Sequence, residues 1–198
     1  MKEKVILFDG TSTEGLTDRN GNPVRWELNK AEGCITIVPG EGDLVSGYTY
    51  GDAHIHVEFK IHLMADKFGQ ERGNSGVYVQ GCYEIQILDS FGTEGLEKDS
   101  CGAIYEQSAP LVNACLPPEE WQTYDIIFRT AKITPDGAIL EPAVITVIQN
   151  GQVIHNNLTL PTNTPGGVYR HVVSRGPFFL QNHRCPVSFR NIWIQPLD

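Results

Sequence analysis

The sequence lacks a long apolar run. No stretch approaches the roughly 20 consecutive apolar residues that a membrane-spanning helix needs, so we expect no membrane span. The opening MKEKVILFDG holds only a four-residue apolar run, too short for the core of a signal peptide. We therefore expect either a cytoplasmic protein or one whose export signal precedes this chain and is removed.

Basic clusters are also missing. The chain has 15 Lys and Arg residues against 24 Asp and Glu residues, a formal net charge of −9. A protein that binds nucleic acid needs a basic patch to displace counterions from the phosphates, and no Lys/Arg cluster of that kind is present. We expect neither a nucleic-acid partner nor attachment to an anionic membrane. The sequence leaves the oligomeric state open.

No pair of cysteines has the C-x-x-C spacing of a zinc site among the five present, so structural zinc is not expected. The number is odd, which leaves at least one free thiol. Cys101 and Cys115 flank a loop-like stretch and are a candidate disulfide, but small buried hydrophobes are the simpler interpretation. His54 and His56 lack a third ligand nearby in sequence, so we predict a solvated strand face there. The sequence has no motif with diagnostic metal-ligand spacing, so we assign no metal ligands and no cofactor, and leave open whether a divalent metal takes part.

Helical periodicity is absent over any stretch longer than about ten residues, and two-residue alternation is present instead. Residues 54–63 alternate apolar and polar side chains almost perfectly, as in a half-buried strand. Asn150-Gly151 lies between two apolar runs, which is the strongest short signal for a hairpin. A length of 198 residues suits one domain, residues 1–198, which would bury about 70% of its unfolded surface.

The expected strands are spread over most of the chain, with loops over 90–120, apart from a short strand, and over 161–177. Many short strands with turn residues between them predict an all-β sandwich or jelly roll, in which the two ends of the chain pair. The predicted strands are 5–8, 34–38, 54–63, 75–81, 83–89, 103–107, 121–130, 143–149, 152–160, 177–183 and 187–197.

Four phrases together resemble the 3-keto-disaccharide hydrolase family. They are ILFDGTSTEGL at the start, GNSGVYVQGCYEIQILDS (73–90), AIYEQSAPLVNACLPPEEWQTYDIIFR (103–129) and PFFLQNHRCPVSFRNIWIQPL (177–197). The resemblance covers essentially the whole chain in the expected order. It implies a concanavalin A-like jelly roll of two curved antiparallel sheets, a saccharide as the substrate, and cleavage of glycosides oxidised to a ketone at C3. Because glycan-processing relatives are often periplasmic, it also favours a periplasmic or secreted protein over a cytoplasmic one.

A looser resemblance links Glu84-Ile-Gln-Ile-Leu-Asp89 to the E-x-D-x-x-E motif of laminarinase-type β-glucanases. Gln86 replaces the Asp of that motif, and Asp89 replaces its final Glu. A retaining glycosidase needs two carboxyl groups about 5–5.5 Å apart. Since glutamine does not titrate, an ordinary double displacement on an unmodified glycan is doubtful for this chain.

Strand parity identifies the candidate catalytic residues. Side chains two apart share a face, so Glu84 and Gln86 point together and away from the neighbouring apolar residues. Asp89 lies an odd number of residues from Glu84, and reaches the same face only through a β-bulge or the end of the strand. An open, solvated sheet face is the alternative interpretation of this strand.

The resemblance places Gln181 and His183 in a Q-x-H block and supports both as site residues. Histidine titrates near neutral pH, so we assign His183 to the catalytic set with Glu84 and Asp89. For substrate binding we add residues with hydrogen-bonding or stacking side chains, although Tyr105 also suits the core and Asn74 also suits a turn. They are Asn74, Gln86, Tyr105, Gln107 and Gln181.

A ketone at C3 acidifies the hydrogen on C2, so one positioned base can remove it and the C1 substituent can leave by elimination. Addition of water then completes a net hydrolysis. We expect Glu84 and His183 to share the proton transfers, Asp89 to support one of them, and Gln86 and Gln181 to donate hydrogen bonds. The alternatives are a non-catalytic carbohydrate-binding jelly roll and a glucanase-type hydrolase.

Overall fold

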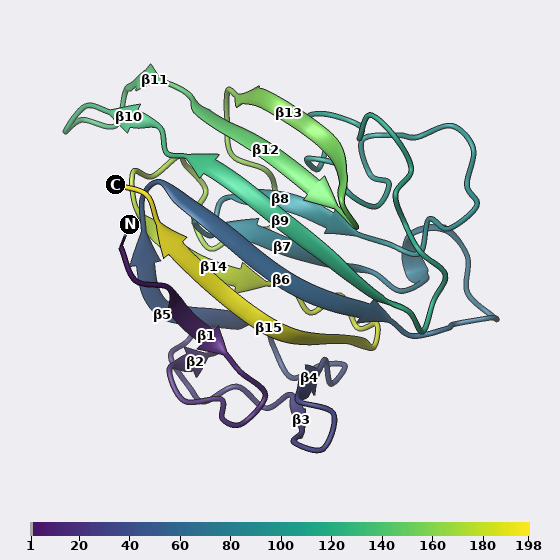
Figure 1. Ribbon diagram of the computed structural model, residues 1–198. Coiled ribbons are helices and arrows are strands. Elements are labelled where there is room, and N and C mark those ends of the chain that lie inside the picture. Colours follow the sequence, from purple (N-terminus) through teal and green to yellow (C-terminus); the bar gives the residue numbers. More distant parts are fainter. Residues whose placement is uncertain (1) are drawn as a thin grey trace.

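The structure, a computed structural model, describes residues 2–198 and consists of two antiparallel sheets packed face to face (Figure 1). The larger sheet has the order β13-β12-β9-β6-β15-β4-β3, and β1 also pairs with β15. The strands of this sheet are β1 (Val5–Phe8), β3 (Glu27–Asn29), β4 (Cys34–Thr36), β6 (Ala53–Ile61), β9 (Trp121–Arg129), β12 (Ala143–Gln149), β13 (Gln152–Leu160) and β15 (Val187–Pro196).

The smaller sheet has the order β2-β5-β14-β7-β8 and forms the rear layer in Figure 1. A two-stranded hairpin and one 3₁₀ turn, η1 (Gly69–Glu71), lie outside both sheets. The strands of the smaller sheet are β2 (Leu16–Thr17), β5 (Leu44–Tyr50), β7 (Ser75–Val79), β8 (Tyr83–Ile87) and β14 (Gly176–Leu180), and those of the hairpin are β10 (Lys132–Ile133) and β11 (Ile139–Glu141).

This architecture confirms the predicted all-β jelly roll of antiparallel sheets. The two ends of the chain pair as expected, with Val5 opposite Ile194, and both termini lie together in Figure 1. Asn150 and Gly151 adopt positive φ angles of 51° and 79°, as a type I′ turn requires, and connect β12 to β13. No helix within residues 2–198 is long and apolar enough to cross a membrane.

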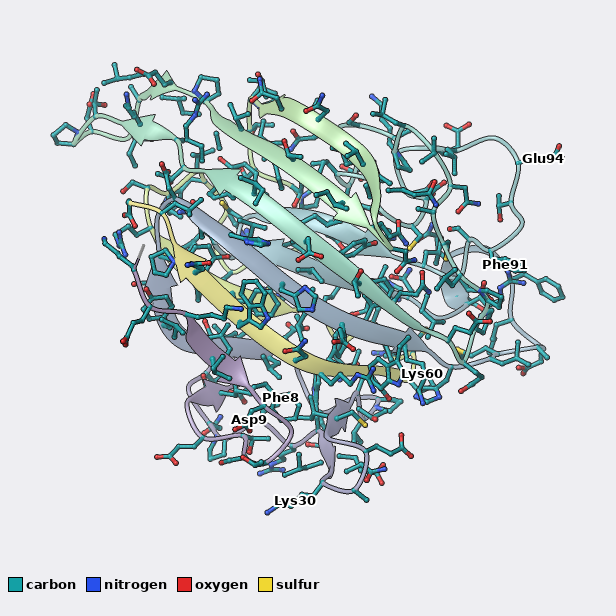
Figure 2. All side chains as sticks on the ribbon, in the orientation of Figure 1. Phe8, Asp9, Lys30, Lys60, Phe91 and Glu94 are labelled. Carbon is teal, nitrogen blue, oxygen red and sulfur yellow. The ribbon has the colours of Figure 1, made fainter. Side chains whose placement is uncertain are left out.

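The core lies between the two sheets and follows from strand alternation. In β6, Ile55, Val57 and Phe59 are fully buried. The alternate side chains point outward from the larger sheet, and Lys60 is visible on that face in Figure 2. Tyr83 of the smaller sheet meets Phe128 of the larger one, with ring centroids 5.7 Å apart. Alternation thus gives each sheet one face toward the core and one face away from it, and in β7, β8 and β14 of the smaller sheet the side chains on both faces are buried.

The outward face of the larger sheet carries a hydrogen-bonded cluster rather than isolated histidines. His54 and His56 both contact one carboxylate oxygen of Asp125, at 3.3 and 2.8 Å. This interaction lowers the pKa of Asp125, with the hydrogen bond from His56 as the main cause. Further along the sheet, Arg190 and Asn191 hold Glu58. These residues lie on the outward face of the larger sheet, away from the smaller sheet that holds β7 and β8.

The predicted strand at 103–107 is wrong. The segment forms turns, with isolated bridges from Ile104 to Ile85 and to Ser108 in place of a strand, and Glu106 has a φ of +59°, in the left-handed region. It nevertheless covers the edge of β8, because Tyr105 donates its backbone N–H to the carbonyl of Glu84 and Gln86 donates to that of Ala103. All five cysteines are buried, and none forms a disulfide, so Cys101 and Cys115 are free thiols.

Substitution of Asn150 should separate turn strain from side-chain bonding. Asn150 accepts from the N–H of Thr123 and donates to the carbonyl of Ala114, both at 2.8 Å. Asn150→Gly keeps the positive φ and loses these bonds, so we expect it to lower the free energy of unfolding by about 1–2 kcal/mol. Asn150→Ala also strains the turn and should cost about 1 kcal/mol more. Equal losses in urea titrations would show that strain contributes nothing.

Candidate active site

A tight hairpin decides which side chains face the site. Gln80 and Gly81 have φ angles of 52° and 65°, so β7 and β8 join through a type I′ turn. Its register places Tyr83 opposite Val79 and Glu84 opposite Tyr78. Three side chains of β8, namely Tyr83, Ile85 and Ile87, enter the core between the sheets. The predicted parity is therefore confirmed, with Glu84 and Gln86 on the opposite face.

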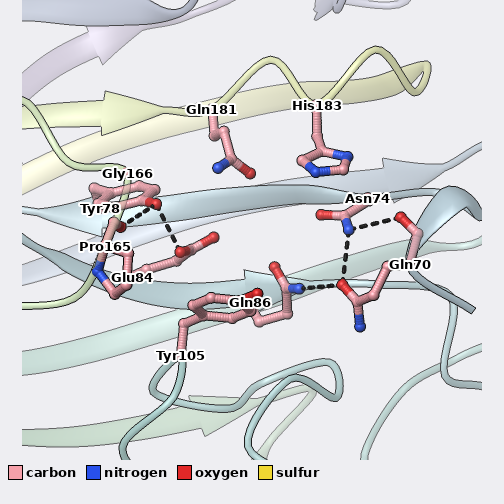
Figure 3. Close-up of a pocket in the computed structure, with 10 residues that line it drawn as sticks. All are labelled: Gln70, Asn74, Tyr78, Glu84, Gln86, Tyr105, Pro165, Gly166, Gln181 and His183. Carbon is pink, nitrogen blue, oxygen red and sulfur yellow. Dashed lines mark hydrogen bonds between the residues drawn. The ribbon is translucent and has the colours of Figure 1, made fainter.

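A pocket of about 100 Å³ lies on the face of the smaller sheet that points away from the core (Figure 3). Strands β7 and β8 form its floor, and the segments after β14, around η1 and around residues 105 and 165 supply its walls. Six of the eight residues predicted for the site lie here, joined by four that were not predicted. The lining residues are Gln70, Asn74, Tyr78, Glu84, Gln86, Tyr105, Pro165, Gly166, Gln181 and His183.

Glu84 is buried in the floor of this pocket, with only 3% of its surface exposed. The hydroxyl of Tyr78 donates to its Oε2 at 2.6 Å. Gly76, on the adjacent strand β7, leaves room for the Glu84 carboxylate in this position, which a Cβ atom there would overlap. Burial raises the pKa of Glu84 to about 7, against the lowering effect of the Tyr78 hydrogen bond. The group can therefore accept or release a proton near neutral pH.

Tyr78 suits both protonation states of Glu84. Its hydroxyl oxygen also lies 2.9 Å from the carbonyl oxygen of Pro165, an acceptor that never donates. A phenol has one proton, so it points to Glu84 when that carboxylate is charged, and is free to point to Pro165 when Glu84 is protonated. Packing against Phe179, with ring centroids 4.6 Å apart, holds the phenol in place. Tyr78 was missed, although the hairpin register alone puts it opposite Glu84.

His183 and Gln181 reach the pocket from beyond the end of β14, which stops at Leu180 rather than continuing to residue 183. The backbone of Gln181 stays attached to the floor, because its N–H donates to the carbonyl of Gly76 at 3.0 Å. Asn182 then fixes the turn by donating to the carbonyls of Val38 and Gly42. Figure 3 shows the side chains of Gln181 and His183 pointing into the pocket from the side opposite Gln86. His183 is solvent-exposed there, so it lies at the mouth rather than the floor.

Three amides form the wall on the η1 side. Asn74 and Gln86, both predicted, donate to the side-chain oxygen of Gln70 at 2.9 and 3.1 Å. Gln70 in turn donates to Asp99. Gln70 belongs to a 3₁₀ turn with no periodic pattern, so nothing in the sequence indicated its position. Tyr105 lines the pocket beside Glu84, as predicted, and partial burial raises the pKa of its phenol.

Two predicted residues lie outside the pocket. The Asp89 carboxylate is buried in an ion pair with Arg72, whose Nε lies 2.8 Å from Oδ2. Strand β8 ends at Ile87, before Asp89, but the side chain of Asp89 then points toward Arg72 and not toward Glu84. The prediction that Asp89 takes part in the catalytic proton transfers is therefore wrong. Gln107 donates to the carbonyl of Thr162 at 2.7 Å, and so holds the loop that carries Pro165 rather than a substrate. Both side chains support segments of the pocket without lining it.

Potential metal ligands are few in this pocket. Glu84 and His183 are the lining residues with a carboxylate or an imidazole. Within the described residues 2–198, no three His, Cys, Asp or Glu side chains have the arrangement of a metal site. The chemistry available from the side chains is proton transfer at Glu84 and His183, with amide and phenol groups for hydrogen bonding.

Comparison with known proteins identifies the family of the chain. Residues 3–195 match the family described as the 3-keto-alpha-glucoside-1,2-lyase-like domain. A crystal structure of a "putative glycosyl hydrolase" from Parabacteroides distasonis is 35% identical, covers 98% of this chain and 84% of that chain, and has a TM-score of 0.90. A second structure with that description from the same organism is 22% identical, covers 98% and 94% of the two chains, and has a TM-score of 0.73.

More distant structures share the fold alone. Alginate lyase Aly36B, in complex with an alginate trisaccharide, is 9% identical, covers 100% of this chain and 99% of that chain, and has a TM-score of 0.51. No protein of curated function matches the sequence. Because the family match extends over nearly the whole chain, this protein belongs to the 3-keto-alpha-glucoside-1,2-lyase-like domain family, and its fold is the concanavalin A-like jelly roll.

Proposed function

We propose that this protein cleaves glycosides whose sugar carries a ketone at C3, with Glu84 as the base that removes the proton from C2. The observation that carries the proposal is a buried carboxyl group in a pocket, with its pKa raised to about 7. A general base works best when its pKa lies near the operating pH. The family description, a 1,2-lyase acting on a 3-keto-glucoside, supports elimination across C1 and C2.

The chemistry needs one base and one acid. Glu84 takes the C2 proton, and the electron pair of that bond delocalises onto the C3 oxygen as an enolate. When the enolate collapses, a C1–C2 double bond forms and the C1–O bond breaks. His183 at the mouth then protonates the departing oxygen. Glu84 then returns its proton to C2 while water adds to C1 and gives a proton back to His183. The free 3-keto sugar forms, both residues regain their starting protonation states, and the sum of the steps is hydrolysis.

The pocket does not suit the two-carboxylate mechanism of ordinary glycosidases. That mechanism needs a second carboxyl group facing the anomeric carbon. Glu84 is the only Asp or Glu among the ten lining residues, since Asp89 is paired with Arg72 outside the pocket. Elimination needs no glycosyl–enzyme intermediate, so one carboxylate is sufficient for it.

Replacing the base tests this assignment. Glu84→Gln preserves the shape of the side chain and removes its titration, so we expect the rate of 3-keto-glucoside cleavage to fall by about 10²–10⁴-fold. Exchange of the C2 hydrogen with deuterated solvent, followed by NMR, should be lost with it. Glu27→Gln, an exposed change on β3, is the control and should leave both rates unchanged. A variant at position 84 that retains exchange would show that another group is the base.

The pH dependence should report Glu84 and respond to Tyr78. A base must be deprotonated, so we expect kcat/KM to rise with pH through a midpoint near 7. The Tyr78 hydrogen bond lowers the pKa of Glu84, so Tyr78→Phe should move this midpoint upward. The loss of rate should therefore be larger at pH 6 than at pH 9. A uniform loss at all pH values would mean that Tyr78 does not tune the base.

The pH dependence of the free energy of unfolding reports the pKa of Glu84 without any substrate. In the folded protein Glu84 keeps its proton up to about pH 7, whereas in the unfolded chain it releases the proton near pH 4.5. Wild type should therefore lose up to about 3 kcal/mol of unfolding free energy, relative to Glu84→Gln, as the pH rises from 4.5 to 7, with little change beyond. Denaturant titrations of both proteins at pH 4.5, 6 and 8 check this. Parallel curves would contradict a raised pKa.

A further inference from the structure

The amide wall of the pocket is fixed in one orientation by acceptors that cannot donate. Gln70 points its NH₂ group at the backbone carbonyl of Asp99 (3.2 Å) and at the Asp99 carboxylate (3.1 Å). Its side-chain oxygen must therefore face the other way, toward Asn74 and Gln86. Both of these amides turn their NH₂ groups to that oxygen.

A second constraint acts on each of the two outer amides. The NH₂ group of Asn74 also donates to the backbone carbonyl of Gln70 at 2.8 Å, and that of Gln86 lies 3.4 Å from the backbone carbonyl of Asp99. Backbone carbonyls accept at every pH, so rotating either amide by 180° would set oxygen against oxygen. The orientation of all three amides therefore follows from the backbone and is independent of protonation.

This orientation leaves two oxygens without partners. Asn74 Oδ1 and Gln86 Oε1 are buried and accept no hydrogen bond within the described chain. Asn74 is 2% exposed and Gln86 is 1% exposed. Figure 3 shows both oxygens pointing away from Gln70, into the space between Glu84 and His183. Buried acceptors are rarely left unpaired in native proteins, so two of them facing one pocket indicate a ligand that donates.

We propose that the side-chain oxygens of Asn74 and Gln86 form an acceptor wall, which accepts hydrogen bonds from two hydroxyl groups of the sugar ring. Gln70 is the positioning residue that keeps the NH₂ groups of these amides turned away from the substrate. The inference rests on the proposed function and specifies its substrate, which is a 3-keto sugar with free hydroxyl donors on the side facing β8 and η1. A ring substituted there by ether, acyl or fluorine offers no donor and is excluded.

The acceptor wall also fixes how the substrate lies. An enolate oxygen is repelled by lone pairs, so the C3 oxygen cannot face Asn74 or Gln86. We expected Gln86 to donate hydrogen bonds to the substrate, but in the structure its NH₂ group donates to Gln70, which leaves its oxygen to accept. Gln181, across the pocket in Figure 3, supplies the amide N–H donor for that oxygen, and His183 remains the acid for the oxygen on C1. Hydroxyls then lie on one side of Glu84 and the ketone on the other.

Fluorinated sugars test the wall directly, because fluorine replaces a hydroxyl as an acceptor but never donates. We would titrate Glu84→Gln calorimetrically with a 3-keto-glucoside and with analogues in which the C4 or the C6 hydroxyl is replaced by hydrogen or by fluorine. At one position or both, fluorine should weaken binding at least as much as hydrogen does, by about 10-fold or more. The proposed acceptor wall would be contradicted by fluoro analogues that bind within about twofold of the parent, or clearly more tightly than the deoxy analogues.

The parent sugar separates the two proposals. If wild type does not exchange the C2 hydrogen of the parent and Glu84→Gln does not bind it, both the proposed function and the acceptor wall fail. If the parent is bound and cleaved but fluorine carries no penalty, the acceptor wall alone fails.

Gln70→Met tests the positioning role. Without the Gln70 side-chain oxygen, the NH₂ group of Gln86 keeps only its 3.4 Å contact with the Asp99 carbonyl and can rotate, whereas the backbone carbonyl of residue 70 still holds Asn74. The fluorine penalty should therefore fall below about threefold at the hydroxyl that Gln86 accepts from. In the otherwise wild-type enzyme, KM should rise while kcat changes less, since Glu84 is untouched. Gln195→Met is the control, because Gln195 lies on β15 with its side chain on the outer face of the larger sheet. It should leave the fluorine penalty unchanged. If Gln70→Met keeps the full fluorine penalty, Gln70 does not position the acceptor wall. If this variant fails to fold, the fluorinated analogues measured on Glu84→Gln still test whether the acceptor wall exists.

Discussion

The desolvation of one carboxyl group is the constraint on which the site depends. Water is the best solvent for a charged Glu84, and the floor of the smaller sheet removes nearly all of it. Gly76 gives the carboxylate room to lie on the strand, and Tyr78 compensates part of the cost with a single hydrogen bond. The residual cost appears as a pKa near 7, which converts a weak acid into a base suited to neutral solution.

Features fixed by strand geometry were predictable from the sequence, and features fixed by loops were not. A side-chain period of two sends Glu84 and Gln86 to the same face wherever the strand pairs. The same reasoning, applied across the hairpin turn, would have found Tyr78 as the partner of Glu84. Gln70 had no such signal, because a 3₁₀ turn of three residues has no period to read.

Asp89 and Gln107 show why parity ends with the strand. Once β8 stops at Ile87, the direction of the next side chains depends on which partner each one meets, and Asp89 meets Arg72. Gln107 follows a left-handed residue and turns to the loop at Thr162. His183 was predicted on a continuing strand and reaches the pocket by another route, through a turn that Asn182 fixes. Its position was therefore right although the geometry behind it was not.

The departures from the glucanase motif are consistent with the amide wall. A carboxylate at position 86 would face the Gln70 oxygen and the Asp99 carbonyl with no proton to donate, and the wall would lose its orientation. It would also place a second negative charge on the same face as Glu84, which would raise the pKa of Glu84 further. The uncharged glutamine points its NH₂ group toward Gln70 and its oxygen toward the pocket. In the proposed mechanism the site works with one base, and the absence of a second carboxylate at position 86 is consistent with it.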